Sequence, residues 1–309
     1  MTIIGPSSTS SFYMTAADQM GSLQSQLDAL NNSISSGSRF SAASQDPIAA
    51  AQMRALQLQD SQGVVSTANA NKATANLQLA DSTLSQMVND ITRAKQLATQ
   101  AATGTLNDTE RTAIGDEMAQ IQKDLIGLAN SRDANGNALF GGGVAGNAYN
   151  VDAQGTVSYT GAVSSPSLDI GNGQSVQTGV TGPEVLDMTD AAGNSTDLLT
   201  VVGNLATALK AGGSTAQTAA SDALTSLSNG LDAVNTAQTT VGTRESWISL
   251  VTQNQTAAAT ARATQESQIG DTDVSGAAIK LQQLTTALQA SQASFVRLSG
   301  LSLFDVIGN

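Results

Sequence analysis

Residues 13–34 read YMTAADQMGSLQSQLDALNNSI, and their apolar side chains recur at alternating intervals of three and four residues. This spacing is typical of helices that pack lengthwise against one another. The run stops at Ser35-Ser36-Gly37, where a glycine can take the left-handed backbone that ends a helix. A matching run covers residues 274–298 and is predicted to end at Ser299-Gly300. The two stripes predict that the ends of the chain pair as antiparallel helices.

Similar stripes fill much of the chain between these ends. They lie at residues 73–98, 114–128, 198–209 and 224–248. Asn107 or Asp108 is expected to cap the helix that contains residues 114–128, and Gly212-Gly213 is expected to separate the last two helices. We therefore expect a mainly α protein: long antiparallel helices, or a coiled-coil bundle, formed by the N- and C-terminal parts of the chain.

Residues 141–194 have a different character, with many glycines and short alternating stretches. Residues 149–151 and 157–159 flank a turn and predict a hairpin. Weaker strand signals surround Leu168, Ile170 and Val176, and Gly182-Pro183 marks a break. This segment predicts a small β-rich outer domain inserted into the helical protein.

Three domains are expected from these changes of pattern. They are a terminal coiled-coil domain (1–45 and 274–309), a helical bundle domain (46–140 and 195–273) and the β-rich outer domain (141–194).

The composition excludes several kinds of chemistry. The 309 residues include no Cys and no His, which rules out Ser-His-Asp and Cys-His catalysis, disulfides, and zinc sites built from thiolates or imidazoles. Thirteen basic residues against twenty-five acidic ones give a net charge of −12, which argues against nucleic acid as a partner. No stretch has the length of apolar sequence that a membrane span needs, and we expect neither a membrane anchor nor a cleaved signal peptide.

The striped ends are almost free of charge. Residues 1–45 carry only Asp18, Asp28 and Arg39, and residues 274–309 carry only Lys280, Arg297 and Asp305. An uncharged face can be buried without removing ions from water, which favours packing against further subunits over an ordinary two-helix element of a soluble monomer. The expected assembly interface comprises Met20, Leu23, Leu27, Leu30, Ile34, Leu281, Leu284, Leu288, Phe295, Leu298, Leu301, Leu303 and Phe304.

Three longer motifs resemble those of bacterial flagellar hook-associated protein 3, in the flagellin-like superfamily. The first is ISSGSR at residues 34–39 followed by DPIAAAQ at 46–52. The second is LANSRDANGN at 128–137 with LFGG at 139–142, and the third is ASFVRLSGLSLFD at 293–305. The chain departs from the family pattern at Thr2, Ser38, Gln45 and Val306, which leaves the details of terminal contacts open.

The resemblance implies a structural, non-enzymatic axial protein of the extracellular flagellum. It implies a homo-oligomeric ring that joins the hook, through hook-associated protein 1, to the flagellin filament. It also implies secretion through the flagellar type III channel with help from a cytoplasmic export chaperone, and no membrane or cofactor. Two alternatives remain: a flagellin that forms the filament itself, and a surface adhesin or glycan-binding module displayed by residues 141–194.

Shorter motifs give weaker signals for binding sites. The glycines of 141–146 fit a dinucleotide fingerprint but follow a helix instead of a strand, which favours a flexible crossing between domains. Asp133 starts a calcium-loop-like stretch that lacks the required Gly and Glu, so an Asx turn is expected. Asp271-Thr272-Asp273 is interpreted as a helix start capped by Thr272 or Asp273, and Trp247 as a packing anchor. No catalytic, cofactor-binding or metal-binding residue is predicted.

The terminal segments are predicted to be largely unstructured in the free monomer, because one pair of helices buries too little apolar surface to offset its ordering entropy. Hydrogen exchange on the purified monomer should find weak protection over residues 13–34 and 274–298. Strong protection there would contradict this prediction.

Overall fold

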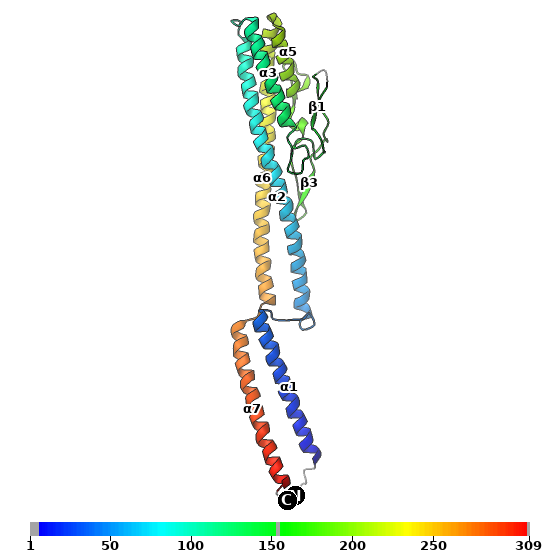
Figure 1. Ribbon diagram of the computed structural model, residues 1–309, viewed down its shortest axis with the longest axis vertical. Coiled ribbons are helices and arrows are strands. Elements are labelled where there is room, and N and C mark those ends of the chain that lie inside the picture. Colours follow the sequence, from blue (N-terminus) through cyan, green and yellow to red (C-terminus); the bar gives the residue numbers. More distant parts are fainter. Residues whose placement is uncertain (1–5, 153–154, 308–309) are drawn as a thin grey trace. The chain divides into compact units, whose positions relative to one another are not determined.

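The chain was examined as a computed structural model. It describes the backbone of residues 6–152 and 155–307, and the side chains of residues 11–152 and 155–297. The residues divide into two compact units, Gln62–Ala257 and the two chain ends, Met1–Ser61 with Ala258–Asn309. The helices and strands are shown in Figure 1. The three-domain division expected from the sequence stays a prediction.

The helices account for most of the described backbone. Their bounds are α1 Pro6–Ser36, α2 Pro47–Ala102, α3 Asp108–Ala129, α4 Gly182–Leu186, α5 Leu198–Ala211, α6 Gly213–Gly270 and α7 Val274–Ile307. Long helices joined to a few short strand pairs confirm the predicted fold class.

The strands form three separate antiparallel pairs. These are β1 Tyr149–Val151 with β2 Val157–Tyr159, β3 Ser167–Gly171 with β4 Gln174–Gln177, and β5 Asp187–Thr189 with β6 Ser195–Asp197. The first pair is the predicted hairpin, with Tyr149 opposite Tyr159. The weak strand signals at Leu168, Ile170 and Val176 are confirmed by the second pair, in which Leu168 lies opposite Val176.

Several local predictions are confirmed by the backbone and its caps. Asn107 caps α3: its side-chain oxygen accepts a hydrogen bond from the Glu110 amide, and the Glu110 carboxylate accepts one from the Asn107 amide. Gly37 follows α1 with φ 71°, the left-handed conformation expected at that helix end. Asp133 forms the expected Asx turn, because its Oδ1 accepts the Asn135 and Asn137 amides at 2.8 and 2.9 Å.

Two expectations are wrong. The helix α7 continues through Ser299-Gly300 to Ile307, because the glycine does not adopt the left-handed backbone that would end it. Trp247 is 41% exposed and is not a packing anchor within the chain, whereas the adjacent Ile248 is buried. The break predicted at Gly182-Pro183 is, by contrast, the boundary at which the short helix α4 begins, since proline is tolerated in the first helical turn.

The glycine-rich stretch 141–146 forms a closely packed turn and not the flexible crossing expected from its composition. A Cβ atom on Gly142, whose φ is 67°, would lie 2.8 Å from the Ser164 carbonyl oxygen. The site has no room for a side chain, so glycine is needed there for both space and conformation.

In the unit Gln62–Ala257, one continuous core joins the helices to the strand region. It includes Leu84 and Ile91 of α2, Leu125 of α3 and Phe140 of the following loop, each at most 1% exposed. The helices α3 and α5 approach closely, since a Cβ on Gly115 would lie 3.0 Å from the Ala206 carbonyl oxygen. Burial of each large aliphatic side chain contributes about 1.5–3 kcal/mol, so this core stabilises the unit.

Polar side chains of the long helices bind the backbone of the strand region. Asn69 of α2 donates to the Asp169 carbonyl at 2.8 Å, and Gln255 of α6 donates to the Ile170 carbonyl. Arg244 of α6 donates to the Gly179 carbonyl at 2.5 Å and to the Gln177 side chain. These hydrogen bonds supply donors to two carbonyls of β3 and to one carbonyl after β4.

Replacing Arg244 with Ala should loosen β3 and β4, because two charge-assisted hydrogen bonds are lost and the Gly179 carbonyl loses its donor. We expect a loss of about 1.5–3 kcal/mol in the free energy of unfolding of the unit. Hydrogen exchange over residues 167–179 should quicken while α3 and α5 stay protected. Lys123→Ala on the exposed surface of α3 is the matched control and should leave the exchange unchanged. Equal exchange in the two variants would contradict the role given to Arg244.

Candidate assembly interface

The helices α1 and α7 pair antiparallel within the unit that contains both chain ends (Figure 1). Near the free ends, the Tyr13 and Phe295 rings meet edge to face with centroids 5.4 Å apart. Toward the other ends, the Thr272 hydroxyl donates to the Ser33 carbonyl at 3.2 Å. The antiparallel pairing predicted from the two stripes is therefore confirmed.

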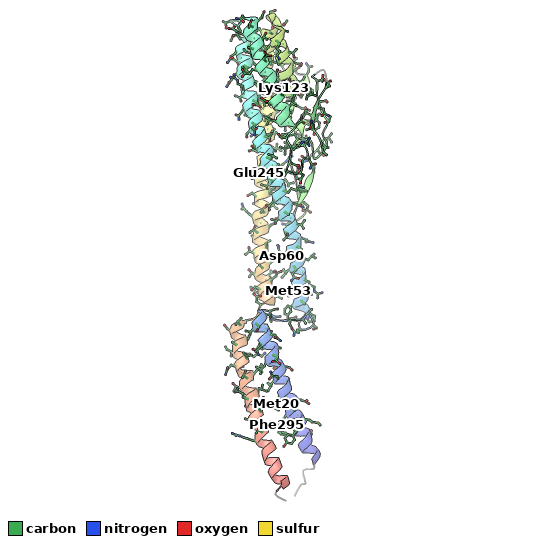
Figure 2. All side chains as sticks on the ribbon, in the orientation of Figure 1. Met20, Met53, Asp60, Lys123, Glu245 and Phe295 are labelled. Atoms are coloured by element: carbon green, nitrogen blue, oxygen red, sulfur yellow. The ribbon has the colours of Figure 1, made fainter. Side chains whose placement is uncertain are left out.

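The predicted interface residues line the seam of this pair but are mostly not fully buried by it. Leu27 is buried, at 7% exposed, and Ala277 beside the α7 stripe is 8% exposed. Figure 2 labels Met20 and Phe295, which border a common groove with Phe12 and Ala16. The half-buried members are Met20, Leu23, Leu30, Ile34, Leu281, Leu284, Leu288 and Phe295. The side chains of Leu298, Leu301, Leu303 and Phe304 lie outside those that the structure describes.

The loop motif around residues 34–52 closes the inner end of the pair. Arg39 forms an ion pair of 2.6 Å with Asp46, and the Arg39 amide donates to the Gly270 carbonyl at 2.7 Å. The Thr272 amide donates to the Gly37 carbonyl at 2.9 Å, so the turn after α1 is joined to the turn before α7. These bonds give Gly37, Arg39 and Asp46 of the first motif a structural role.

Asp46 also caps α2, where its Oδ1 accepts the Ala49 amide at 3.0 Å. The Ala49 amide is the largest influence on this carboxyl and, with Arg39, holds the pKa of Asp46 below its ordinary value. Because the folded-state pKa is lowered, the stability that Asp46 contributes is present above its ordinary pKa and is lost as the pH falls through the folded-state value.

Several apolar side chains of this unit stay largely exposed and were not recognised in the sequence. Phe12, Met14 and Ile279 are 47%, 67% and 63% exposed, and Ile48 and Leu58 of α2 are 73% and 61% exposed. They fall outside the predicted three-and-four stripes, because those stripes identify only the residues on the helix face that packs against a neighbouring helix. For Phe12, Met14 and Ile279 the signal that could have found them is the low charge of residues 1–45 and 274–309; Ile48 and Leu58 lie beyond these low-charge segments.

The acidic residues before α7 accept hydrogen bonds at the start of that helix and at the end of α6. Asp273 accepts the Ser275 and Gly276 amides at 3.1 and 3.2 Å, which confirms it as the cap, while Asp271 accepts from the Ser267 hydroxyl. Among the residues that the structure describes, no three Asp or Glu side chains gather as a metal site would require. Within the same residues, no helix combines the length and apolar character of a membrane span.

The family model and the relatives that match this chain are all flagellar proteins. Residues 8–145 match the family model described as the bacterial flagellin N-terminal helical region. Flagellar hook-associated protein 3 of Salmonella typhimurium is 27% identical over 97% of this chain and 98% of its own length. The Escherichia coli protein of the same name is 28% identical over 88% of this chain and 90% of its own length. The chain resembles hook-associated protein 3 over nearly its full length.

Solved structures agree with this resemblance at the level of the fold. A flagellar hook-associated protein from Vibrio parahaemolyticus superposes with a TM-score of 0.67 at 18% identity, covering 74% of this chain and all of that one. The flagellar junction protein from Legionella pneumophila gives a TM-score of 0.59 at 13% identity, covering 71% of this chain and 99% of its own. Polar flagellin F of Vibrio parahaemolyticus, in contrast, is 29% identical over only 42% of this chain.

These relatives confirm the resemblance to hook-associated protein 3 that the three motifs predicted. The interface residues themselves are not tested by the relatives and stay a prediction.

Leu27→Lys and Leu288→Lys place an ammonium group in the seam between α1 and α7. Each should abolish incorporation into the flagellum, because about 1.5–3 kcal/mol of apolar burial is lost and a charge must be desolvated. The unit Gln62–Ala257 should stay folded, which circular dichroism and proteolysis can check. Leu27→Met and Leu288→Met keep the volume and should assemble. Normal motility of both lysine variants would contradict the prediction that Leu27 and Leu288 belong to the assembly interface.

Proposed function

We propose that this chain is the subunit that joins the flagellar hook to the flagellin filament. Copies assemble into a ring through α1 and α7, between hook-associated protein 1 on the hook side and flagellin on the filament side. The chain acts on no substrate, and its role is mechanical. It leaves the cell through the flagellar type III channel, with a cytoplasmic export chaperone bound to its C-terminal segment, and works outside the cell.

One observation carries this proposal: the pairing of α1 with α7 leaves the leucine stripe half-buried. Completing the burial of each half-buried leucine gains about 1 kcal/mol at 25 cal/mol per Å². The pair offers few charges to oppose such contacts, since the described side chains of α1 and α7 include only Asp18, Asp28, Lys280 and Arg297 as charged groups. Neighbouring copies and other axial proteins supply the missing surface.

The three sequence domains then take distinct places in the assembly. In this proposal residues 1–45 and 274–309 form an inner tube, residues 46–140 and 195–273 surround it, and residues 141–194 face outward. The outer region carries the exposed side chains Val151 and Val163, at 48% and 95% exposure.

Deleting the gene should give cells that bear hooks without filaments and release flagellin into the medium. Electron microscopy of the cells and immunoblotting of the medium measure both results. A plasmid carrying the wild-type gene should restore filaments, and one carrying Leu288→Lys should not. Full-length filaments on the deletion strain would overturn the proposal.

A second experiment separates this function from that of a flagellin. Purified protein is added to isolated hooks that carry hook-associated protein 1. A junction subunit should add a short collar and then stop, whereas a flagellin should grow long filaments from seeds. Long filaments of this chain alone would favour the flagellin alternative.

A further inference from the structure

The first turns of α2 carry apolar side chains on two opposite sides of the helix. The inner side packs within the chain, where Ala49 and Ala50 are buried. On the same side Asp60, labelled in Figure 2, forms an ion pair of 2.6 Å with Arg262 of α6. The residues of the opposite side are all exposed, and we call them the α2 outer face: Ile48, Ala51, Ala55 and Leu58.

The α2 outer face has the spacing of a surface that packs against another helix. Its members are separated by three, four and three residues, so they form one continuous stripe along α2. Ile48 and Ala51 belong to the DPIAAAQ motif, in which Asp46 caps the helix and Ala49 and Ala50 are buried. The described chain leaves the whole stripe exposed, and the spacing identifies a helix as the kind of partner that fits it.

A second exposed stripe lies on α1, on the side away from its seam with α7. Its members, the α1 outer face, are separated by four, three and four residues: Met14, Asp18, Gly21 and Ser25. Gly21 lies in the interior of α1, where glycine is less favourable than alanine, and a Cβ placed on it would meet no other group within 4 Å. Packing within the described chain therefore does not require this glycine, whereas small residues let a neighbouring helix approach closely.

The two outer faces match in size and in charge when they run in opposite directions. On α2, Arg54 lies four residues before the leucine of the outer face and three after its first alanine. On α1, Asp18 lies four residues after the methionine and three before the glycine. Antiparallel packing therefore places the cation beside the carboxylate, leucine beside methionine, and alanine beside glycine. Parallel packing with the same ion pair would place Gly21 beside Gln57 instead.

Arg54 and Asp18 are both available for such an ion pair. Both side chains are exposed. Within the described structure, the Arg54 guanidinium donates only to the Ala50 carbonyl of its own helix, at 3.2 Å, and Asp18 takes part in no hydrogen bond or ion pair. The pairing therefore breaks no contact of this unit with another part of the described chain.

We propose that α1 of a second copy packs antiparallel against the α2 outer face. The proposal rests on the ring of copies put forward above, and it names a contact through which neighbours in that ring meet. Two different patches of one chain form a heterologous contact, which repeats from copy to copy and can close a ring. The expected neighbours across the contact are Leu58 with Met14, Ala55 with Ala17, Arg54 with Asp18, and Ala51 with Gly21.

The contact is too small to hold a dimer in free solution. A stable interface buries about 800 Å² on each partner. The α2 outer face, with two alanines, one isoleucine and one leucine, covers much less than that area. Copies should therefore meet here only in the assembled ring, where other contacts hold them side by side.

Disulfide cross-linking tests the contact, because the chain has no cysteine of its own. Two single variants, Ala17→Cys and Ala55→Cys, are mixed, assembled on isolated hooks that carry hook-associated protein 1, and oxidised. We expect most of the assembled protein to run as a covalent dimer on a non-reducing gel, and neither variant alone to do so. Ala17→Cys mixed with Ala51→Cys is the matched control: it lies one helical turn out of register, beyond the Cα separation of about 4.4–6.8 Å that a disulfide needs. We expect about fivefold less dimer from this control.

Charge exchange tests the same contact without cysteine, and it serves if the cysteine variants fail to assemble. Arg54→Asp and Asp18→Arg should each raise the protein concentration needed for collar growth by about two- to fivefold, the size expected for an exposed ion pair. The double variant restores opposite charges across the contact and should return to the wild-type concentration. Gln57→Asp, at an exposed position on another side of α2, is the matched control and should assemble as the wild type does.

Two outcomes would overturn the proposal, and they differ in what else they refute. Collars that form without the cross-link between positions 17 and 55, or charge variants whose defects add in the double variant, would refute this contact and leave the junction role intact. Failure of the wild-type protein to add to hooks would refute the junction role, and the contact with it.

Discussion

The leucine stripe between α1 and α7 is the interaction on which the proposed role of this protein depends. Two helices that meet along a narrow seam bury only one side of each large side chain, so Leu27 is nearly enclosed while Leu23 and Leu288 are half-buried. In most proteins a third element completes such a seam. Here the outer faces are almost uncharged and carry Phe12 and Met14, so other subunits can complete it without a large desolvation cost.

The unit Gln62–Ala257 is stabilised in a different way. It has a continuous apolar core, and its strand region is held by side chains of α2 and α6 that bind backbone carbonyls, as Asn69 and Arg244 do. Three isolated two-stranded pairs would be marginal by themselves, because a lone hairpin buries little apolar surface. The strand region is therefore ordered by the helices on which it packs. The low charge of the chain ends has no counterpart here, since ion pairs such as Lys210 with Asp116 at 2.9 Å link neighbouring helices.

The first two motifs that resemble hook-associated protein 3 have structural explanations in the described residues. Arg39 and Asp46 bridge the turn between α1 and α2, and Asp133 organises the loop after α3 through the amides of Asn135 and Asn137. Burial raises the pKa of Asp133, but these hydrogen bonds outweigh it and hold the pKa below its ordinary value. The motif residues act on the backbone of the chain itself, which is consistent with a protein whose function is to hold a shape.

The sequence by itself determined the long helices, their antiparallel pairing at the chain ends, the first hairpin, the strand positions around Leu168 and Val176, and the flagellar resemblance. These features depend on local spacing, capping and turn residues, which act over a few positions and can be recognised without tertiary contacts. The tertiary structure alone decided which stripe residues are enclosed, that α7 continues past Gly300, that Trp247 is exposed and that Arg244 binds the Gly179 carbonyl. Those outcomes depend on side chains from segments far apart in the chain, and no local pattern records which of them meet.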